Sequence, residues 1–308
     1  MKGIIKLFSI LFFLSVFLKI VDVIKNLLIA SKLGVSNEAD IYLALVSIPD
    51  SMLILLGFDT MRGVLNSEYS SINKESSKKI IFDSFSNILN IVFILGCILI
   101  ILMIIFRENV ISILLPGFSD IKMEVALALS VIIFPVLLFR AFITLFQSFF
   151  YSFDRAYVAT GGPIIISLAV ILFVFLPLIG NSLLNNISFG FLSGNVVLVL
   201  FYLGIYLYHG GHIKLFRFKF DDITKNVLKG SLSILVLVLF NQVYFFSKNF
   251  FASYFGEGAI SSLNYSSSVA SLIPALIFAS VFSVLLSRLS SLSVRGKRSS
   301  IKNLYLNS

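Results

Sequence analysis

The stretch from residue 156 to residue 208 contains no Asp, Glu, Lys or Arg, and this feature constrains the possible folds most. A helix needs roughly 20 apolar residues to cross the hydrocarbon core of a bilayer, so the stretch is long enough for two crossings. Gly180, Asn181 and Ser182 lie near its middle, where a polar turn can join two helices. A membrane barrel would alternate apolar and polar residues, which this stretch does not do. The sequence therefore predicts a helical membrane protein.

Apolar stretches of similar length recur along the whole chain, of which 58% is hydrophobic and 13% charged. Ordinary soluble domains carry about twice that share of charged residues, so a soluble fold is excluded. The expected fold class is all-α, a polytopic membrane bundle of about eight transmembrane helices. Their predicted positions are 4–31, 41–65, 84–106, 125–151, 157–179, 188–208, 228–251 and 259–286.

The net charge of +9 comes from residues that lie mostly in loops. Lys and Arg gather in the N-terminus, in the second, fourth and sixth loops and in the C-terminal tail, whereas the opposite loops hold only Lys32, Arg107 and Lys122. Because positive residues favour the cytoplasmic side, both termini are expected there. The charge therefore indicates orientation and contact with membrane lipids, and no nucleic-acid partner is expected.

Enzyme chemistry finds no support in the sequence. The predicted loops are too short to hold a soluble catalytic domain, and the chain has no Walker A, HExxH or GxSxG motif. The single cysteine, Cys97, lies in an apolar stretch, so neither a disulfide framework nor a CxxC metal site is possible. We expect no cofactor, no metal and no catalytic residue.

Two segments of the chain resemble each other. Residues 25–34 and 248–256 share Lys-Asn, Ala-Ser and Gly once one gap is allowed, although chance similarity in a biased composition is the alternative. Repeated helix bundles of the same orientation are one plan of transporters. On this basis we expect a six-helix lobe at 1–226, the first two helices of a second lobe at 227–290, and a polar cytoplasmic tail at 291–308.

Charged residues inside the predicted spans indicate where a functional cavity lies, because each costs roughly 2.5–3.5 kcal/mol at bilayer depth. Lys19, Asp22 and Lys25 are three residues apart in the first span, which places them on one face of a helix. This stripe is either a self-neutralising ladder between helices or the wall of a water-filled cavity. Its surplus of cations favours the cavity.

Further spans add the cations Arg140 and Lys248 and the anion Asp50. Together with the first span they leave the predicted interior positive, which suits binding of an anionic substrate. Arg140 and Lys248 could instead extend their stems toward the interface. Asp40 opens the second span, where a carboxylate can cap a helix. Gating or ion coupling is the functional alternative for Asp40, and the same role is considered for Asp50.

An ordered set of motifs is similar to the MurJ/MviN lipid II flippase family of the multidrug/oligosaccharidyl-lipid/polysaccharide exporter superfamily, over most of residues 1–290. The motifs are Leu33-Gly34-Val35-Ser36-Asn37-Glu38-Ala39-Asp40-Ile41-Tyr42, Ile48-Pro49-Asp50, Leu115-Pro116-Gly117-Phe118, Phe134-Pro135, Leu145-Phe146-Gln147, Phe153 and Gly162-Pro163. The resemblance implies a two-lobed carrier in the bacterial cytoplasmic membrane. Such a carrier moves an undecaprenyl-diphosphate-linked saccharide to the outer leaflet by alternating access.

The resemblance also implies roles for single residues. Lys19 and Lys25 fall on basic positions of the family and Asp40 on an acidic one, whereas Leu53 and Ser268 stand where the family carries arginine. Lysine lacks the two-pronged fork with which arginine grips a diphosphate, so a lipid-linked glycan other than lipid II stays open. The family has more helices than eight.

Because of that difference in helix number, a partner chain that completes the second lobe has to be considered. Two other functions stay open. The chain could be a truncated or accessory fragment without transport of its own, or, less favoured, a membrane glycan polymerase or ligase.

Overall fold

The computed structural model describes residues 2–71, 78–153, 155–176, 182–214 and 222–271, without the side chains of 2–8, 59, 70–71 and 232–245. The predicted tail at 291–308 and the eighth predicted span beyond residue 271 lie outside the described residues.

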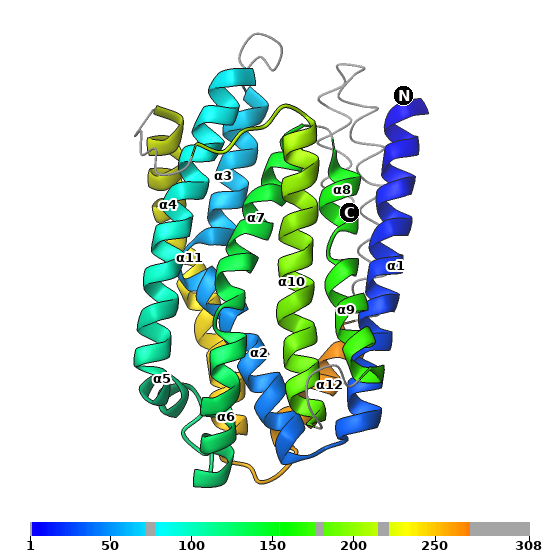
Figure 1. Cartoon of the computed structure of the whole chain (residues 1–308), viewed down its shortest axis with the longest axis vertical. Helices are drawn as coiled ribbons and strands as arrows, with labels where there is room; N and C mark the ends of the chain where they lie inside the picture. Colours follow the sequence, from blue (N-terminus) through cyan, green and yellow to red (C-terminus); the bar gives the residue numbers. More distant parts are fainter. Residues whose placement is uncertain (1, 72–77, 154, 177–181, 215–221, 272–308) are drawn as a thin grey trace, which may run out of the picture.

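The secondary structure of the described part is α-helical throughout. In chain order the helices are α1 (Lys2–Leu33), α2 (Asn37–Leu55), α3 (Phe58–Ser71), α4 (Lys78–Ile105), α5 (Arg107–Leu114), α6 (Asp120–Ile133), α7 (Val136–Ser152), α8 (Ala156–Gly161), α9 (Ile164–Phe175), α10 (Leu183–Tyr208), α11 (Asp222–Ala252) and α12 (Ala259–Ala270). Most of them lie along the longest dimension of the molecule (Figure 1). The predicted all-α membrane bundle is confirmed.

Each predicted span coincides with one helix or with two consecutive helices. The pairs α2 and α3, α6 and α7, and α8 and α9 form the second, fourth and fifth spans, and α12 begins the eighth. By length and apolar composition, three described segments can cross a membrane alone: α4, α8 together with α9, and α10. The number rises to five if each bent helix pair counts as one span.

Two spans bend where the sequence interrupts helical geometry. The pair α2 and α3 meets at 50° near Gly57, whose φ of 76° is a left-handed conformation that glycine adopts without strain. The pair α6 and α7 meets at 41° next to Pro135, which has no N–H to continue the helical ladder. Asp50 precedes the first bend and Arg140 follows the second, so both bends lie close to predicted site residues.

Gly190 and Gly194 allow α10 to lie directly against α9. Small residues four positions apart are typical of close helix contacts in membranes. A methyl group on Gly194 would lie 2.9 Å from Ile166 Cα, and one on Gly190 would lie 2.8 Å from Phe173 Cβ. This close approach positions Phe191, which directly follows the first glycine, beside the cavity described below.

Aromatic side chains fill the contact between α4, α7 and α10. The ring centroids of Phe85 and Phe149 lie 4.8 Å apart, and Tyr206 lies 5.3 Å from Phe85. Such pairs contribute roughly 0.5–1.5 kcal/mol each beyond the burial of their area. Tyr202 donates a hydrogen bond of 3.0 Å to the carbonyl of Ala159, which joins α10 to α8. These contacts fix α7 and α10, two of the helices that surround the cavity described below.

Candidate functional site

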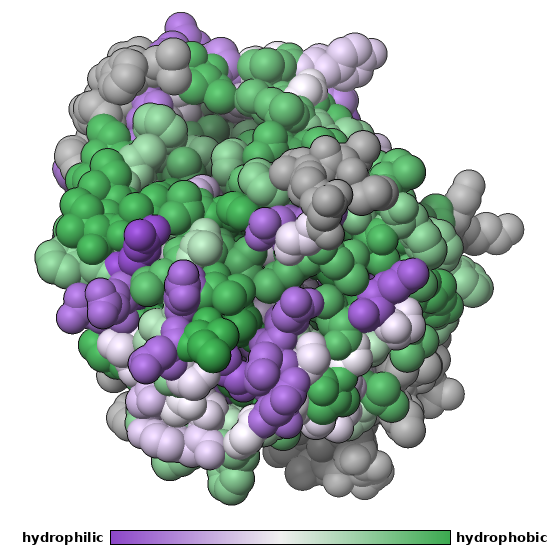
Figure 2. All heavy atoms as spheres, turned by 60° about the horizontal axis from the view of Figure 1, so that its bottom comes forward, coloured by the Kyte–Doolittle hydropathy of each residue, from purple (hydrophilic) through white to green (hydrophobic). Residues whose placement is uncertain are grey.

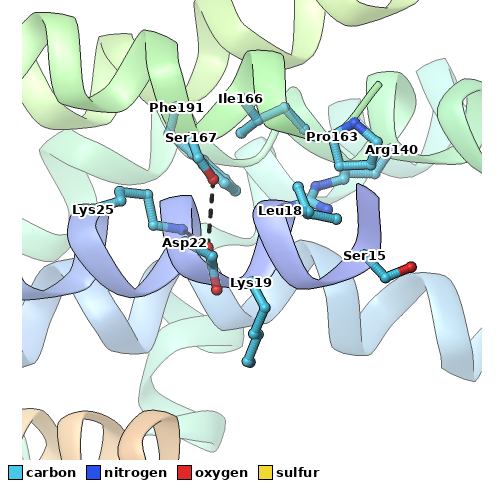
Figure 3. Close-up of a pocket in the computed structure, with 10 residues that line it drawn as sticks. All are labelled: Ser15, Leu18, Lys19, Asp22, Lys25, Arg140, Pro163, Ile166, Ser167 and Phe191. Atoms are coloured by element: carbon cyan, nitrogen blue, oxygen red, sulfur yellow. Dashed lines mark hydrogen bonds and ion pairs between the residues drawn. The ribbon is translucent and has the colours of Figure 1, made fainter. Parts of the chain in front are cut away.

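A cavity of about 270 Å³ lies between α1, α7, α9 and α10. Its wall consists of Ser15, Leu18, Lys19, Asp22, Lys25, Arg140, Pro163, Ile166, Ser167 and Phe191 (Figure 3). Three cations and one carboxylate are therefore among its lining residues. Pockets for drug-sized molecules measure roughly 300–1,000 Å³, so this one has room for a small charged group and not for a whole lipid-linked saccharide.

Asp22 and Lys25 form an ion pair along α1. Lys25 Nζ lies 2.5 Å from Asp22 Oδ1, and Ser167 of α9 donates to the same oxygen at 3.4 Å. The two side chains are 34% and 19% exposed, so the pair remains partly hydrated. An ion pair at such exposure contributes little free energy, and a competing anion can replace Asp22 beside Lys25.

Lys19 points away from the side of the cavity on which Asp22 meets Ser167 (Figure 3). Its Nζ lies 3.3 Å from Ser271 Oγ, one residue beyond the end of α12. The predicted stripe on α1 is therefore divided between two neighbours. Asp22 and Lys25 lie on the side of α9, and Lys19 reaches toward the end of α12.

Arg140 is held from two sides by residues of other helices. Its Nε lies 3.4 Å from Asp50 Oδ1 of α2, and its guanidinium lies 5.3 Å from the centre of the Phe191 ring. Among the residues that the structure describes, the buried Nε has no hydrogen-bond partner, so its contact with Asp50 is an ion pair only. Asp50 is 49% exposed, which makes the pair weak. The planar guanidinium is therefore preoriented at the cavity by Phe191 and bound only loosely by its carboxylate.

Lys248 does not join this group. Its Nζ donates to Asn264 Oδ1 at 2.9 Å and lies 3.5 Å from Ser267 Oγ, both on α12. The sequence placed Lys248 with the cations of the first span because all of them lie inside predicted spans. The structure shows why it is separate: α11 and α12 form their own hairpin, and Lys248 joins the two helices of that hairpin.

Asp40 is buried, with 1% of its surface exposed, and of its two readings the structure does not bear out that of a cap on its own helix. Ser36 caps α2 by accepting a hydrogen bond from the N–H of Ala39. Asp40 instead accepts hydrogen bonds from the N–H groups of Gly258 and Ser261 at the start of α12, each at 2.8 Å. Lys122 of α6 lies 3.1 Å from the same carboxylate.

These contacts lie where α1 and α11 end and α2, α6, α10 and α12 begin, at the lower end of Figure 1. We call it the outer end, after the orientation predicted from the sequence. Figure 2 brings this end forward and shows hydrophilic residues gathered there among hydrophobic ones. Asp40 thus joins α2 to α6 and to the start of α12 at a single point of the outer end.

Gly117 brings the loop between α5 and α6 against the end of α11. Its N–H donates to Ser253 Oγ at 3.0 Å, and a methyl group at this position would lie 2.2 Å from the Ser253 carbonyl oxygen. The Leu-Pro-Gly-Phe motif found in the sequence therefore has a physical reason, since only glycine allows this approach.

Substitution of Gly117 by alanine should destabilise the protein by about 1–3 kcal/mol, because overpacking against a backbone carbonyl cannot be relieved by side-chain rotation. Thermal unfolding of the detergent-solubilised chain measures the effect. Gly63→Ala is the matched control: a methyl group there meets nothing within 4 Å, and alanine favours the helix by roughly 0.5–1 kcal/mol. Equal unfolding temperatures for both variants would contradict the packing argument.

The structure adds site residues that sequence reasoning missed. Phe191 and Ser167 are uncharged, so the search for charges within spans passed over them. Gly190 and Gly194 could have indicated Phe191, because a close helix contact fixes its neighbours. The sequence predicts Lys122 in an outer loop, and no sequence signal connects it with Asp40.

Comparison with known proteins places these features in a family. The family model of the lipid II flippase MurJ matches residues 29–307. A solved structure of the lipid II flippase MurJ in an inward closed conformation is similar with a TM-score of 0.75 and 23% identity, and the match covers 92% of this chain and 59% of that one. A solved structure of the MATE multidrug transporter DinF-BH has a TM-score of 0.61 and 17% identity, with 92% and 62% covered.

A comparison with curated proteins gives no match. The chain spans about three fifths of the length of the solved flippase to which it is similar. The structural likenesses, at these low identities, show the fold, whereas the family model extends over nearly all of the chain. On that match, the chain belongs to the MurJ lipid II flippase family.

Proposed function

We propose that this chain belongs to a carrier that moves an undecaprenyl-diphosphate-linked saccharide across the bacterial cytoplasmic membrane by alternating access. The observation that carries the proposal is the cavity with Lys19, Lys25 and Arg140 in its wall. Charged residues at bilayer depth are costly and mark substrate pathways by default. The family membership supports a transporter rather than an enzyme.

The diphosphate is the part of the substrate that fits this cavity. Arg140 supplies the planar fork that the lysines lack, and its weak pair with Asp50 can give way to a phosphate oxygen. Lys25 can likewise release Asp22 and bind a phosphate oxygen in its place. The saccharide then lies outside the first lobe, and the prenyl tail stays in lipid. Lipid II and other cell-envelope glycan precursors share this diphosphate, so both are substrate candidates.

Release on the outer side requires separation of the contacts around Asp40, which we propose as a gating residue. Asp50 is the proposed coupling residue, because it is half exposed and pairs only weakly with Arg140. In this scheme it loses that pair once the guanidinium binds an anion. An ion gradient or the membrane potential supplies the energy in this scheme. Lys248 contributes to substrate binding only if the hairpin of α11 and α12 moves toward the cavity.

The proposal places residues 1–226 in the first lobe, 227–290 in the first two helices of a second, and 291–308 in a polar tail, with both termini in the cytoplasm. The solved flippase is longer than this chain, and the match between them covers 59% of the solved flippase. Where the remaining second-lobe helices are not on the same polypeptide, a partner chain supplies them. The second candidate, which the sequence leaves open, is an accessory fragment without transport of its own.

Reconstitution in liposomes tests both candidates. Fluorescent undecaprenyl-diphosphate disaccharide should move between leaflets faster with the chain than in empty liposomes, and an undecaprenyl-monophosphate sugar should move more slowly. Transport only after addition of a chain carrying the remaining helices would favour the fragment. Equal rates for both lipids under both conditions would reject an anion-selective carrier.

A further inference from the structure

The two helix hairpins that meet at the outer end have corresponding turns. The first hairpin consists of α1 and α2 and the second of α11 and α12, which contain the two copies of the predicted repeat. Each turn contains a repeat glycine with positive φ, Gly34 at 64° and Gly256 at 29°. Left-handed backbone at both places supports the view that the hairpins are built alike.

Two repeat-related asparagines cross between the hairpins. Asn26 Nδ2 of α1 lies 3.4 Å from Ser268 Oγ of α12, and Asn249 Nδ2 of α11 lies 2.9 Å from Ser47 Oγ of α2. Both serines donate their own hydroxyl proton to a carbonyl of their helix, at 2.9 Å and 2.6 Å. Their oxygens are therefore free to accept from the asparagines. In both contacts the first helix of one hairpin donates to the second helix of the other.

A carboxylate also crosses in each direction. Asp40 of the first hairpin accepts from the N–H groups of Gly258 and Ser261, and Glu257 of the second accepts from the N–H of Asn37 at 3.3 Å. Each acid thus meets the positive N-terminal end of the opposite second helix. The two directions differ in strength, because Asp40 is buried and makes two short bonds whereas Glu257 is exposed and makes one long bond.

We propose that these contacts form a reciprocal latch that closes the outer end. Each hairpin gives the other an asparagine amide and a carboxylate, so opening at this end breaks both directions together. Because both asparagine contacts join the same two hairpins, each adds to the free energy that opening requires, although the two contacts share no atom. The latch rests on the proposed alternating access only in requiring that the outer end opens.

The test uses thiol labelling and not transport, so a chain that transports nothing can still confirm the latch. Cys97 is first replaced by serine, and Ser261→Cys then supplies a reporter at a position with 0% exposure beside Asp40. A membrane-impermeant maleimide is added to intact cells, and its labelling rate is measured. In this background Asn26→Ala and Asn249→Ala should each raise the rate by about 2- to 10-fold, the worth of one ordinary hydrogen bond.

In the double variant, with both Asn26→Ala and Asn249→Ala, the labelling rate should rise by the product of the two single increases. The exchange Asn26→Ser with Ser268→Asn, which rebuilds the contact with donor and acceptor reversed, should restore slow labelling. Ser31→Ala is the matched control, since within the described part of the chain its hydroxyl bonds only to the carbonyl of Leu28 in its own helix, and its loss should leave the rate unchanged. The latch is rejected if Asn249→Ala speeds labelling and Asn26→Ala does not. It is also rejected if the exchange fails to restore slow labelling, or if Ser31→Ala speeds labelling as much as the asparagine variants.

Discussion

Replacement of Asp40 by alanine should lower the free energy of unfolding by about 3–5 kcal/mol, the usual effect of removing one partner of a buried charge pair. The variant leaves two backbone N–H groups and the Lys122 ammonium without their acceptor. Asn at position 40 should recover part of the loss, because its amide oxygen accepts one bond while its NH2 group opposes the other donors.

Thermal or denaturant unfolding in detergent measures this effect. Asp120→Ala is the control: Asp120 is exposed in the first turn of α6, where a carboxylate contributes at most about 1 kcal/mol through the helix dipole. If both alanine variants unfold alike, Asp40 does not hold the outer end together.

Replacement of both Lys19 and Lys25 by glutamine should lower the apparent affinity for a diphosphate-linked lipid roughly 100-fold or more. A hydrogen bond from a charged donor contributes about 1.5–3 kcal/mol, and each 1.36 kcal/mol is a factor of ten. Glutamine keeps most of the length of the side chain but not its charge. Transport in liposomes and complementation of a flippase-deficient strain at normal expression are the measurements.

Lys32→Gln is the matched control, because Lys32 is exposed at the end of the same helix and does not line the cavity. Arginine at positions 19 and 25 keeps the charge and adds the fork, so that variant should retain transport. Unchanged transport by the double glutamine variant would remove these lysines from the binding site and leave Arg140 to be tested alone.

The helical architecture could be predicted from the sequence because it depends on local properties. Stretches without charge, such as 156–208, have no other stable form in a bilayer, and Gly180 to Ser182 mark a turn by residue type alone. The stripe of Lys19, Asp22 and Lys25 was also predictable, since helical periodicity fixes which residues share a face.

The partners of these residues could not be predicted, because they depend on how distant helices pack. Asp40 looks like a cap at the start of its own helix, yet its acceptor atoms face α12, more than two hundred positions further along the chain. Arg140 shows no sequence sign of Phe191 or Asp50. By sequence Lys248 cannot be told from the other cations within spans, because a hydropathy profile does not show which helices pack together.

The carboxylate of Asp40 bonds to main-chain atoms of α12 and not to side chains there, and this has an evolutionary consequence. Substitutions at the start of α12 can accumulate without loss of the two acceptor contacts, provided that the left-handed glycine at 258 is kept. For these two contacts selection then falls on one acid in α2, whereas they place no demand on the side chains at the start of α12.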